Sequence, residues 1–404
     1  GRKDTFFKDI NTFSPTDYIE IDSNLNISVK KFYDENSFSL KNFKKINFSK
    51  DFSKNIKNFL ATILKDNKKN LATSTSGGID SAIILWNLKK NLSNKSKIHS
   101  YTVAFDNKYN FDETKMSKLI AKDFSDKHKI LNINYKDLIK DLPKIYNFLD
   151  TPIPTASLYG FYYLYRHLSK YKYEKIFSGY GGNYLNAGVY PSYLFNFLDI
   201  INIKKFKNEF KSWQNIHDTI KHPKNKKAFN DFVKDHYDTN IKGKVLDKFF
   251  YLTDKNLLKL NIKRKKYRDN SKILNFGNYL DSYNHYAIMY DSVAQASDLE
   301  DNLDYLTNIK SVSPLTEKSL IAFGLSLKQQ QKIKNGVNRV EIRKVFKNKL
   351  LSELLENPHT EGFKLPTNQW FSKEMRSFLL RIIKSKKFKS IKLFSNKEIK
   401  KLFL

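Results

Sequence analysis

The residues best suited to phosphate chemistry are concentrated in one short loop. The stretch LATSTSGGIDS places five small hydroxyl side chains, two glycines and one acid ahead of an apolar run. Gly77 and Gly78 permit a tight backbone path, and Ser76 and Ser81 offer hydroxyl donors to phosphate oxygens. Asp80 would repel a bare phosphate, but it could hold a magnesium ion that bridges the phosphates. The pattern predicts a phosphate-binding loop that carries a metal ligand.

A second interpretation of this loop stays open. It could be a serine-capped helix after a glycine turn, in which Asp80 only favours the dipole of the first helical turn. The loop also lacks the Gly-Lys-Ser/Thr ending of the common mononucleotide-binding loop. The elements on either side of the loop must decide between the two interpretations. A loop that joins a strand to a helix directs its backbone amides at an anion.

Strands and helices alternate around the loop. Apolar runs predict four strands, at Leu71–Thr75, Ile98–Phe105, Lys129–Tyr135 and Lys175–Gly179. Helical spacing predicts helices at Phe52–Asp66, Ser81–Lys90, Asp112–His128 and Ala156–Lys170. Such alternation implies parallel pairing through right-handed crossovers, so we expect an α/β fold with a doubly wound, mostly parallel sheet. Ligands bind beyond the carboxyl ends of the strands in this architecture.

The two flanks of this region differ from it. Asp17–Tyr33 alternates on both sides of SNLN and predicts a hairpin. Past Tyr190 the pattern changes to long amphipathic segments, which predict a large helical carboxyl-terminal portion. These segments are Asp281–Asp301, Ser319–Lys332 and Val340–Glu356. Periodicity does not decide whether they pack onto the sheet.

Composition limits the classes of function. The 404 residues can build one large core or two smaller ones. No run approaches the roughly eighteen apolar residues of a membrane span, and no secretory leader is visible, so we expect a cytoplasmic protein without a membrane partner. The sequence has no cysteine, which excludes disulfides, thiolate zinc sites, iron–sulfur clusters and a cysteine nucleophile within these residues.

The formal charge of +32 has two explanations. Clustered lysines and arginines bind nucleic acids by releasing counterions from phosphates. Here the lysines are spread over separate patches without one dense arm, which a lysine-rich composition alone would produce. We favour the compositional explanation and expect no nucleic-acid partner.

Several segments resemble a known family. SGGIDS matches the SGGxDS pyrophosphate loop of the ATP pyrophosphatase (PP-loop) superfamily, whose members cleave ATP between its α and β phosphates. SYTVAFDNKYNFDE, LDTPIPTAS and FSGYGGNYLNAG are similar in order and spacing to the asparagine synthetase family. LEDNLDYLTNIKSVSPLTE, RVEIRKVF and EGFKLPTNQW resemble later segments of that family. The resemblance implies an adenine-nucleotide α-hydrolase-like fold.

The resemblance also implies a domain plan. Residues 51–404 would form the asparagine-synthetase-like domain, with a nucleotide-binding core at 51–190 and a helical part at 191–404. Residues 1–50 look like the last strand and exit of the amidotransferase domain that precedes it in the family. The glutaminase of that family uses an N-terminal cysteine. Either a glutaminase half lies outside these residues, or the protein uses another amine.

The activity that the resemblance implies is ATP-dependent amide formation. A small-molecule carboxylate becomes an acyl-adenylate with release of pyrophosphate, and an amine donor then displaces AMP. The implied ATP-binding residues are Ser76, Gly77, Gly78, Asp80, Ser81, Val103, Ser178 and Gly179. Mg²⁺ would be held by Asp80 and Asn183. The acyl substrate and the oligomeric state, including a homodimer, stay open.

The sequence departs from the family in the loop that reads SGYGGNY, where asparagine synthetases usually read SGDGGDE or SGEGSDE. Tyr180, Asn183 and Tyr184 replace three acids. Asn183 should weaken metal binding by the loss of a charged ligand, although an amide oxygen can still coordinate.

Two further departures remove positive charge. Thr155 stands where the family often has an arginine, and Thr360 stands where it has a lysine that contacts pyrophosphate. Arg339, Lys334 and Lys364 are candidates to replace that lysine in space. Of these we select Arg339 as a catalytic residue.

Tyr180 is the second predicted catalytic residue. The β-lactam synthetase branch of the family has a tyrosine here that works with a glutamate to deprotonate an internal amine. Glu209 is a candidate for that glutamate. Alternatively, Tyr180 only fills the space of a lost carboxylate. Glu300 and Arg343 lie in family-like segments and could line the substrate cleft or pair on a helix surface.

Four functions remain under consideration. We prefer an asparagine-synthetase-like carbon–nitrogen ligase that forms AMP. An intramolecular ligase of the β-lactam-synthetase or macrolactam type is the first alternative. A nucleotide-binding relative without catalysis and a PP-loop tRNA-modifying enzyme are the others, and the segments GYGGN, SPLTE and GFKLP disfavour the last.

Overall fold

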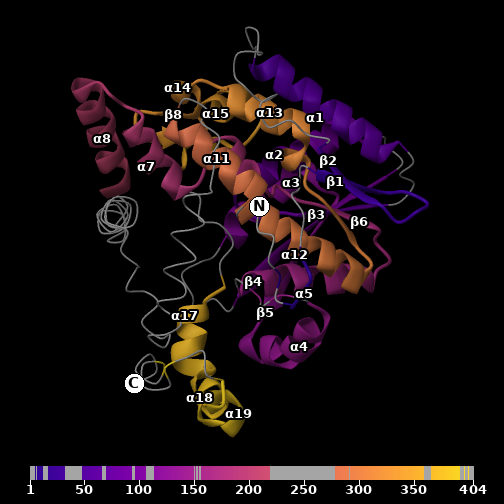
Figure 1. The fold of residues 1–404 in the computed structure, drawn as a ribbon. Coiled ribbons are helices and arrows are strands. Elements are labelled where there is room, and N and C mark those ends of the chain that lie inside the picture. Colours follow the sequence, from indigo (N-terminus) through magenta and orange to yellow (C-terminus); the bar gives the residue numbers. More distant parts are fainter. Residues whose placement is uncertain are drawn as a thin grey trace. The chain divides into compact units, whose positions relative to one another are not determined.

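The computed structural model describes most of the chain. It covers residues 5, 7–11, 17–31, 48–65, 70–92, 96–105, 113–149, 151, 153, 156–218, 278–290, 292–358, 365–391, 395 and 399 (Figure 1). The predicted positions Thr155, Thr360 and Lys364 lie outside these residues. By its internal contacts the chain divides into two units, Gly1–Ser212 with Leu274–Leu365 and Trp213–Ile273 with Pro366–Leu404. This division does not test the predicted domain boundaries, which stay a prediction.

A parallel sheet of five strands organises the first unit. Its strands are β3 (Leu71–Ser74), β4 (Ile98–Phe105), β5 (Lys127–Ile133), β6 (Lys175–Phe177) and β7 (Lys310–Val312). They lie in the order β5-β4-β3-β6-β7, and every neighbouring pair is parallel. The strand order reverses between β3 and β6, so the two loops that leave these strands flank a topological switch point. The predicted fold class is confirmed.

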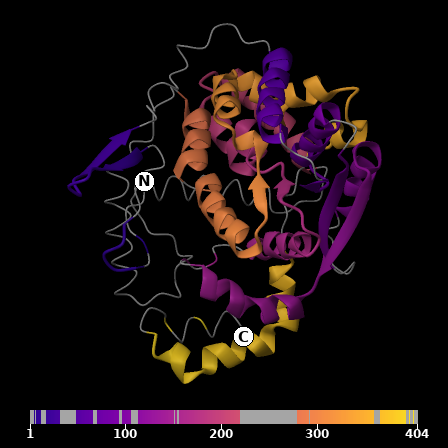
Figure 2. The same ribbon diagram turned by 90° about the vertical axis from the view of Figure 1, so that its right-hand side faces the viewer.

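Helices connect the strands and cover the sheet. The helices between strands are α2 (Ile79–Asn91), α3 (Thr114–Phe124), α4 (Tyr135–Phe148) and α5 (Leu158–Ser169). After β6 come α6 (Gly182–Leu185), α7 (Tyr190–Leu198), α8 (Ile203–Asp218), α11 (Tyr279–Tyr290) and α12 (Ser292–Thr307). Figure 2 shows α11 and α12 in orange, and α12 packs against both β7 and α5.

The carboxyl-terminal part of the first unit is built from short elements. They are η4 (Pro314–Thr316), α13 (Lys318–Ser326), α14 (Gln329–Lys332), β8 (Ile333–Lys334), β9 (Val337–Asn338), α15 (Val340–Phe346) and α16 (Ser352–Glu356). Together with α1 (Phe48–Leu64) they bury one apolar core against α2 and the sheet. Phe346 of α15 lies edge-on to Phe52 of α1 and to Trp86 of α2, with ring centroids 6.1 and 5.5 Å apart.

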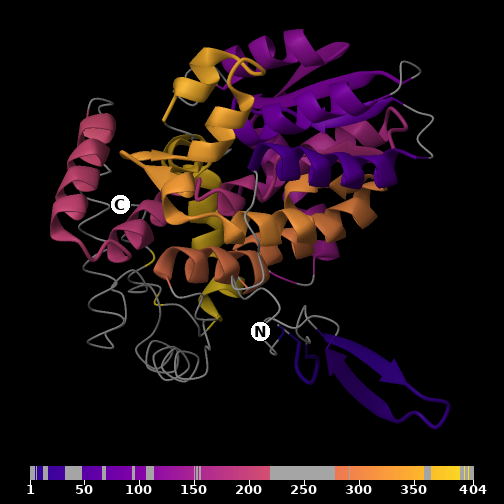
Figure 3. The same cartoon turned by 90° about the horizontal axis from the view of Figure 1, so that it is seen from above.

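Two further parts are an N-terminal hairpin and the helices of the second unit. The hairpin expected at Asp17–Tyr33 is confirmed as β1 (Asp17–Ile21) paired with β2 (Ile27–Lys31), the indigo strands of Figure 3. In the second unit, α17 (Thr367–Gln369), the π-helical turn η5 (Trp370–Glu374), α18 (Arg376–Lys384) and α19 (Lys386–Lys389) follow one another. Among the helices described, none is long and apolar enough to cross a membrane.

The structure corrects several predicted boundaries. The helix expected to end at His128 ends at Phe124, because β5 begins at Lys127 and pairs with β4. The strand expected to reach Tyr135 ends at Ile133, because the side chain of Asn134 caps α4 by accepting the Lys136 and Asp137 amides at 2.9 and 3.0 Å.

Other differences concern whole elements. We did not predict α4 from the sequence, although it runs over 14 residues with an internal proline. Each of the three long helices expected past Tyr190 consists of two helices, α11 with α12, α13 with α14, and α15 with α16. This region also supplies β7, whose three residues are too few to show a period in the sequence.

Candidate active site

A cavity of about 510 Å³ lies where the loops after β3 and β6 meet α5 and α12. The predicted residues in its lining are Ser76, Gly78, Asp80, Ser81, Val103, Ser178, Gly179, Tyr180, Asn183 and Arg339. Gly77 is not in the lining, and it packs against α3, where a Cβ would lie 3.1 Å from the Cβ of Met116. The structure thus gathers around one space residues that are distant in sequence, such as Asp80 and Arg339, which are 259 positions apart. Their roles in binding stay predictions.

The loop between β3 and α2 is held by its own hydroxyl groups. The Ser81 hydroxyl lies 3.0 Å from the Ser76 carbonyl and 2.9 Å from the Gly78 carbonyl, and both oxygens are acceptors for it. The Gly78 amide donates to the Ser76 hydroxyl at 3.1 Å. These contacts shape the loop before any ligand arrives, and they direct the N-terminus of α2 toward the cavity, where an anion is favoured.

The loop after β6 approaches this helix start closely. At Gly179 an added Cβ would lie 2.5 Å from the Asp80 carbonyl carbon and 2.5 Å from the Ser81 nitrogen. Both are backbone atoms that cannot move aside cheaply, so only glycine fits this position. The close approach joins the two loops into one surface at the switch point of the sheet.

Asp80 and Asn183 both contact the side chain of Arg339. A guanidinium nitrogen of Arg339, Nη2, donates to Asp80 Oδ2 at 2.8 Å and also donates to Asn183 Oδ1. Arg339 is 1% exposed and immediately precedes α15. The structure therefore brings the two expected metal ligands together, with a protein cation between them.

This arrangement does not fit a magnesium ion held by Asp80 and Asn183. One oxygen of each side chain, Asp80 Oδ2 and Asn183 Oδ1, already accepts a hydrogen bond from Arg339. Across the described residues, no group of three or more His, Cys, Asp or Glu side chains is placed to hold a metal. The other carboxylate oxygen of Asp80, Oδ1, accepts no hydrogen bond from the described residues, and it is the oxygen of this pair left for an outside ligand.

Tyr180 belongs to the loop after β6, and its side chain contacts α12. Its hydroxyl donates to the Ser292 carbonyl of α12 at 3.1 Å, and its amide donates to the Ser178 hydroxyl at 3.3 Å. Burial, followed by the nearby carboxylate of Glu300, raises the pKa of Tyr180 well above its ordinary value. The phenol is therefore neutral and serves as a hydrogen-bond donor.

Glu300 is the one acid of α12 in the lining, and it is 5% exposed. Tyr165 donates to its Oε1 at 3.2 Å. Burial raises the pKa of Glu300 to about 7, with help from the carboxylates of Asp304 and Asp301 and against the hydrogen bond from Tyr165. A carboxyl group with such a pKa can accept or release a proton near neutral pH.

Three other candidates lie elsewhere. The carboxylate of Glu209 accepts the Asn335 and Gly336 amides at 2.8 and 2.7 Å, so it caps the turn between β8 and β9, and it is absent from the cavity lining that contains Tyr180. Arg343 donates to backbone carbonyls, including that of Asn338 at 2.8 Å, and is absent from the cavity lining. Lys334 is exposed and is also absent from that lining.

Sequence reasoning missed most of the wall opposite the loops. The residues of α12 in the lining share one helical face, and they are Ser292, Gln295, Ala296 and Leu299, together with Glu300, which the sequence had offered as a candidate. The helix α5 contributes Leu158, Gly160, Phe161 and Leu164. The spacing of these residues was visible in the sequence. Which face of each helix turns toward the cavity was not.

Comparisons with known proteins add the following findings. A family model described as asparagine synthase matches residues 66–404. No curated protein matches the chain. Among solved structures, the U34-tRNA thiolase NcsA from Methanococcus maripaludis is similar at 16% identity and a TM-score of 0.27, over 39% of this chain and 55% of the thiolase. The NH3-dependent NAD synthetase from Campylobacter jejuni is similar at 13% identity and a TM-score of 0.25, over 50% of this chain and 98% of the synthetase.

Proposed function

Because this chain belongs to the asparagine synthase family, we propose that it is an ATP-dependent ligase that joins a carboxylate to an amine. The observation that carries this proposal is the close approach of the loops after β3 and β6. They enclose one cavity at the switch point of a parallel sheet, and the N-terminus of α2 points into it. This is where such a sheet binds the phosphates of a nucleotide.

The proposed reaction has two steps. A carboxylate oxygen of the substrate attacks the α-phosphorus of ATP, the bond to the β-phosphate oxygen breaks, and pyrophosphate leaves. An amine then attacks the acyl carbon, the bond to AMP breaks, and the amine gives up a proton. Both steps depend mainly on positioning and on neutralising phosphate charge, which a preformed loop supplies.

The residues have separate roles in this proposal. The amides and hydroxyls of the loop from Ser76 to Ser81 bind the phosphates, and Val103, Ser178 and Gly179 border the nucleoside. Arg339 supplies positive charge beside the phosphates. The face of α12 that lines the cavity holds the acyl substrate and its amine partner, which we propose are small molecules.

The test is the stoichiometry of the products. Purified protein, ATP and a library of carboxylates with ammonium or primary amines should release pyrophosphate and AMP in equal amounts. Gly179→Ala should abolish this release, because the new Cβ would collide with the start of α2. Lys344→Ala, which removes a charge from a side chain that is 66% exposed, is the control and should leave it unchanged.

Two results would contradict the proposal. Formation of ADP and phosphate would mean that ATP is cleaved between its β and γ phosphates and not between α and β. ATP binding without pyrophosphate from any substrate would favour a non-catalytic relative.

A second candidate is supported by Glu300 and Tyr180. Amide formation needs a group that takes the proton of the attacking amine, and the pKa of Glu300, raised to about 7, suits that role. Both side chains line the cavity, as an intramolecular lactam-forming ligase would require. Amino-acid substrates that contain both the carboxylate and the amine separate the two candidates. A cyclic product formed without added amine would favour the lactam-forming enzyme.

A further inference from the structure

The geometry around Arg339 resembles that of a bound metal ion. One nitrogen, Nη2, contacts both Asp80 Oδ2 and Asn183 Oδ1, as a single cation between two oxygen ligands would. Asp80 belongs to the first turn of α2 and Asn183 to α6, so the contact ties together the two loops of the cavity. The guanidinium lines the cavity beside Asp80.

The guanidinium group is held in place by its neighbours. Gly188 lies directly against it, and an added Cβ there would be 2.3 Å from the guanidinium carbon. The Gly188 amide donates to the backbone carbonyl of Asn183, and the Asn338 side chain donates to the Gly188 carbonyl at 3.4 Å. Arg343 in turn donates to the Asn338 carbonyl. The position of Arg339 is therefore built into the fold.

The backbone of Arg339 supports the same conclusion. Its φ of 54° lies in the left-handed region, which residues other than glycine rarely adopt. Such a conformation persists only where the surrounding structure enforces it. Here it turns the chain from β9 into α15 and directs the side chain inward, where it is 1% exposed.

The charges around this contact are balanced. Asp80 contributes one negative charge, Asn183 contributes none and Arg339 contributes one positive charge. A divalent ion with the same two ligands would leave one positive charge in excess, and magnesium favours carboxylate ligands together with phosphate oxygens. A single guanidinium therefore suits a site with one carboxylate and one amide.

We propose that Arg339 is the resident cation of this site and replaces a divalent ion held between Asp80 and Asn183. This inference rests on the proposed function, because it assumes that the cavity binds the phosphates of ATP. It assigns to a side chain the bridging of Asp80 and Asn183 beside the phosphates. Nucleotide binding then does not require a metal ion on these two ligands.

The first experiment uses the unaltered protein. Calorimetric titration with ATP in EDTA and in Mg²⁺ should give dissociation constants within a factor of about three of each other. Titration with Mn²⁺ in the absence of ATP should give the same heat for the unaltered protein and for Asp80→Asn. Metal-dependent ATP binding, or Mn²⁺ heat that Asp80→Asn abolishes, would overturn the inference but leave the proposed function standing. Failure to bind ATP under both conditions would overturn both.

The second experiment tests the side chain. Arg339→Ala should weaken ATP binding in EDTA by roughly tenfold or more, the usual effect of losing a hydrogen bond to a charged group. Mg²⁺ should restore most of the loss. Combining Arg339→Ala with Asn183→Asp should create a site that binds Mn²⁺ without nucleotide.

The matched control for this experiment is Lys344→Ala, which removes one exposed positive charge from α15. It should bind ATP in EDTA as the unaltered protein does. Arg339→Lys keeps the charge on a shorter, compact group and should fall between the unaltered protein and Arg339→Ala. Equal affinities of Arg339→Ala and the unaltered protein in EDTA would contradict the proposal.

Discussion

At the scale of single residues, Glu300 makes stability depend on pH. Its folded-state pKa, raised to about 7 by burial, exceeds the ordinary value of 4.5. The folded protein therefore holds the proton more tightly than the unfolded chain. The stability from this proton is complete below pH 4.5 and is lost as pH rises through about 7. The difference corresponds to at most about 3 kcal/mol.

We predict that Glu300→Gln removes this dependence. Glutamine cannot ionise, but its amide oxygen can still accept the hydrogen bond from Tyr165. Urea unfolding at pH 8 should show the variant more stable than the unaltered protein by up to about 3 kcal/mol, with little difference at pH 5. Glu356→Gln, at an exposed position, should have the same effect at both pH values. A Glu300→Gln variant that is equally stable or less stable at pH 8 would refute this role of burial.

The residues that sequence alone could identify are those with local chemistry. SGGIDS could be recognised because its loop is shaped by contacts within six residues, such as those of Ser81 with Ser76 and Gly78. The partner of Asp80 lies 259 residues away, and only the folded chain shows that Arg339 reaches it. Glu209 was offered as the partner of Tyr180 from its short distance along the chain, but its carboxylate accepts the amides of the turn between β8 and β9. Distance along the chain does not determine which side chains come together in the fold.

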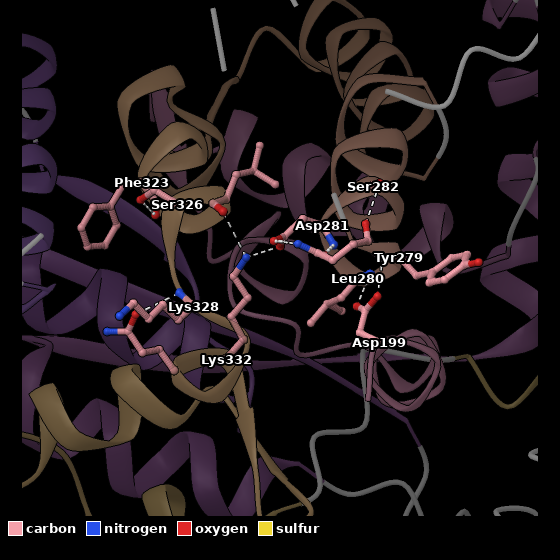
Figure 4. Close-up of polar contacts among 12 residues, drawn as sticks. Asp199, Tyr279, Leu280, Asp281, Ser282, Phe323, Ser326, Lys328 and Lys332 are labelled. Atoms are coloured by element: carbon pink, nitrogen blue, oxygen red, sulfur yellow. Dashed lines mark hydrogen bonds and ion pairs between the residues drawn. The ribbon is translucent and has the colours of Figure 1, made fainter. Parts of the chain in front are cut away.

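At the scale of elements, one buried ion pair connects α14 to α11. Lys332 of α14, 1% exposed, donates to Asp281 and also to the Leu325 carbonyl at 3.3 Å (Figure 4). Asn278 donates to the other oxygen of Asp281 at 2.8 Å. Because α14 leads directly into β8, β9 and Arg339, the pair fixes the segment that brings this arginine to the cavity.

We predict that Lys332→Met destabilises the first unit by about 3–5 kcal/mol, because it leaves a buried carboxylate without its cation. The double variant Lys332→Met with Asp281→Asn should recover much of the loss, since no unpaired charge remains. Urea unfolding measures both changes. Lys328→Met, four residues earlier at an exposed position, is the control. A loss below about 1 kcal/mol for Lys332→Met would show that the pair does not anchor α14.

Elements were predictable where they are long and periodic. β4 has the bounds expected from its apolar run, Ile98–Phe105. By contrast, β7 exists because Lys175 to Phe177 of β6 offers an unpaired edge to Lys310 to Val312, which is a tertiary effect. The long helices were divided for a similar reason: Asn348, at a φ of 66°, follows α15 and turns the chain so that α16 can pack.

At the scale of the whole molecule, the helix α15 belongs to the apolar core and also positions a residue of the site. The main apolar cluster extends from Phe52 of α1 to Leu355 of α16, across the sheet. Phe346 packs into this cluster at the end of α15, and Arg339 immediately precedes the same helix. The position of the cation thus depends on the core as well as on its own hydrogen bonds. Sequence could predict the apolar residues, but not that a helix near the end of the unit packs against its first helix.

This dependence gives a prediction that compares two core variants. Phe346→Ala should destabilise the protein by about 3–5 kcal/mol, as large-to-small changes of buried aromatic residues do. It should also weaken ATP binding by roughly threefold to thirtyfold, because α15 then holds Arg339 less firmly. Leu60→Ala, equally buried but on α1, which contributes nothing to the cavity lining, should lower stability and leave ATP affinity nearly unchanged. Thermal unfolding and ATP calorimetry at a temperature where both variants are folded measure the two quantities. If both variants lose affinity equally, the effect is general loosening of the core, and α15 has no special part in positioning the cation.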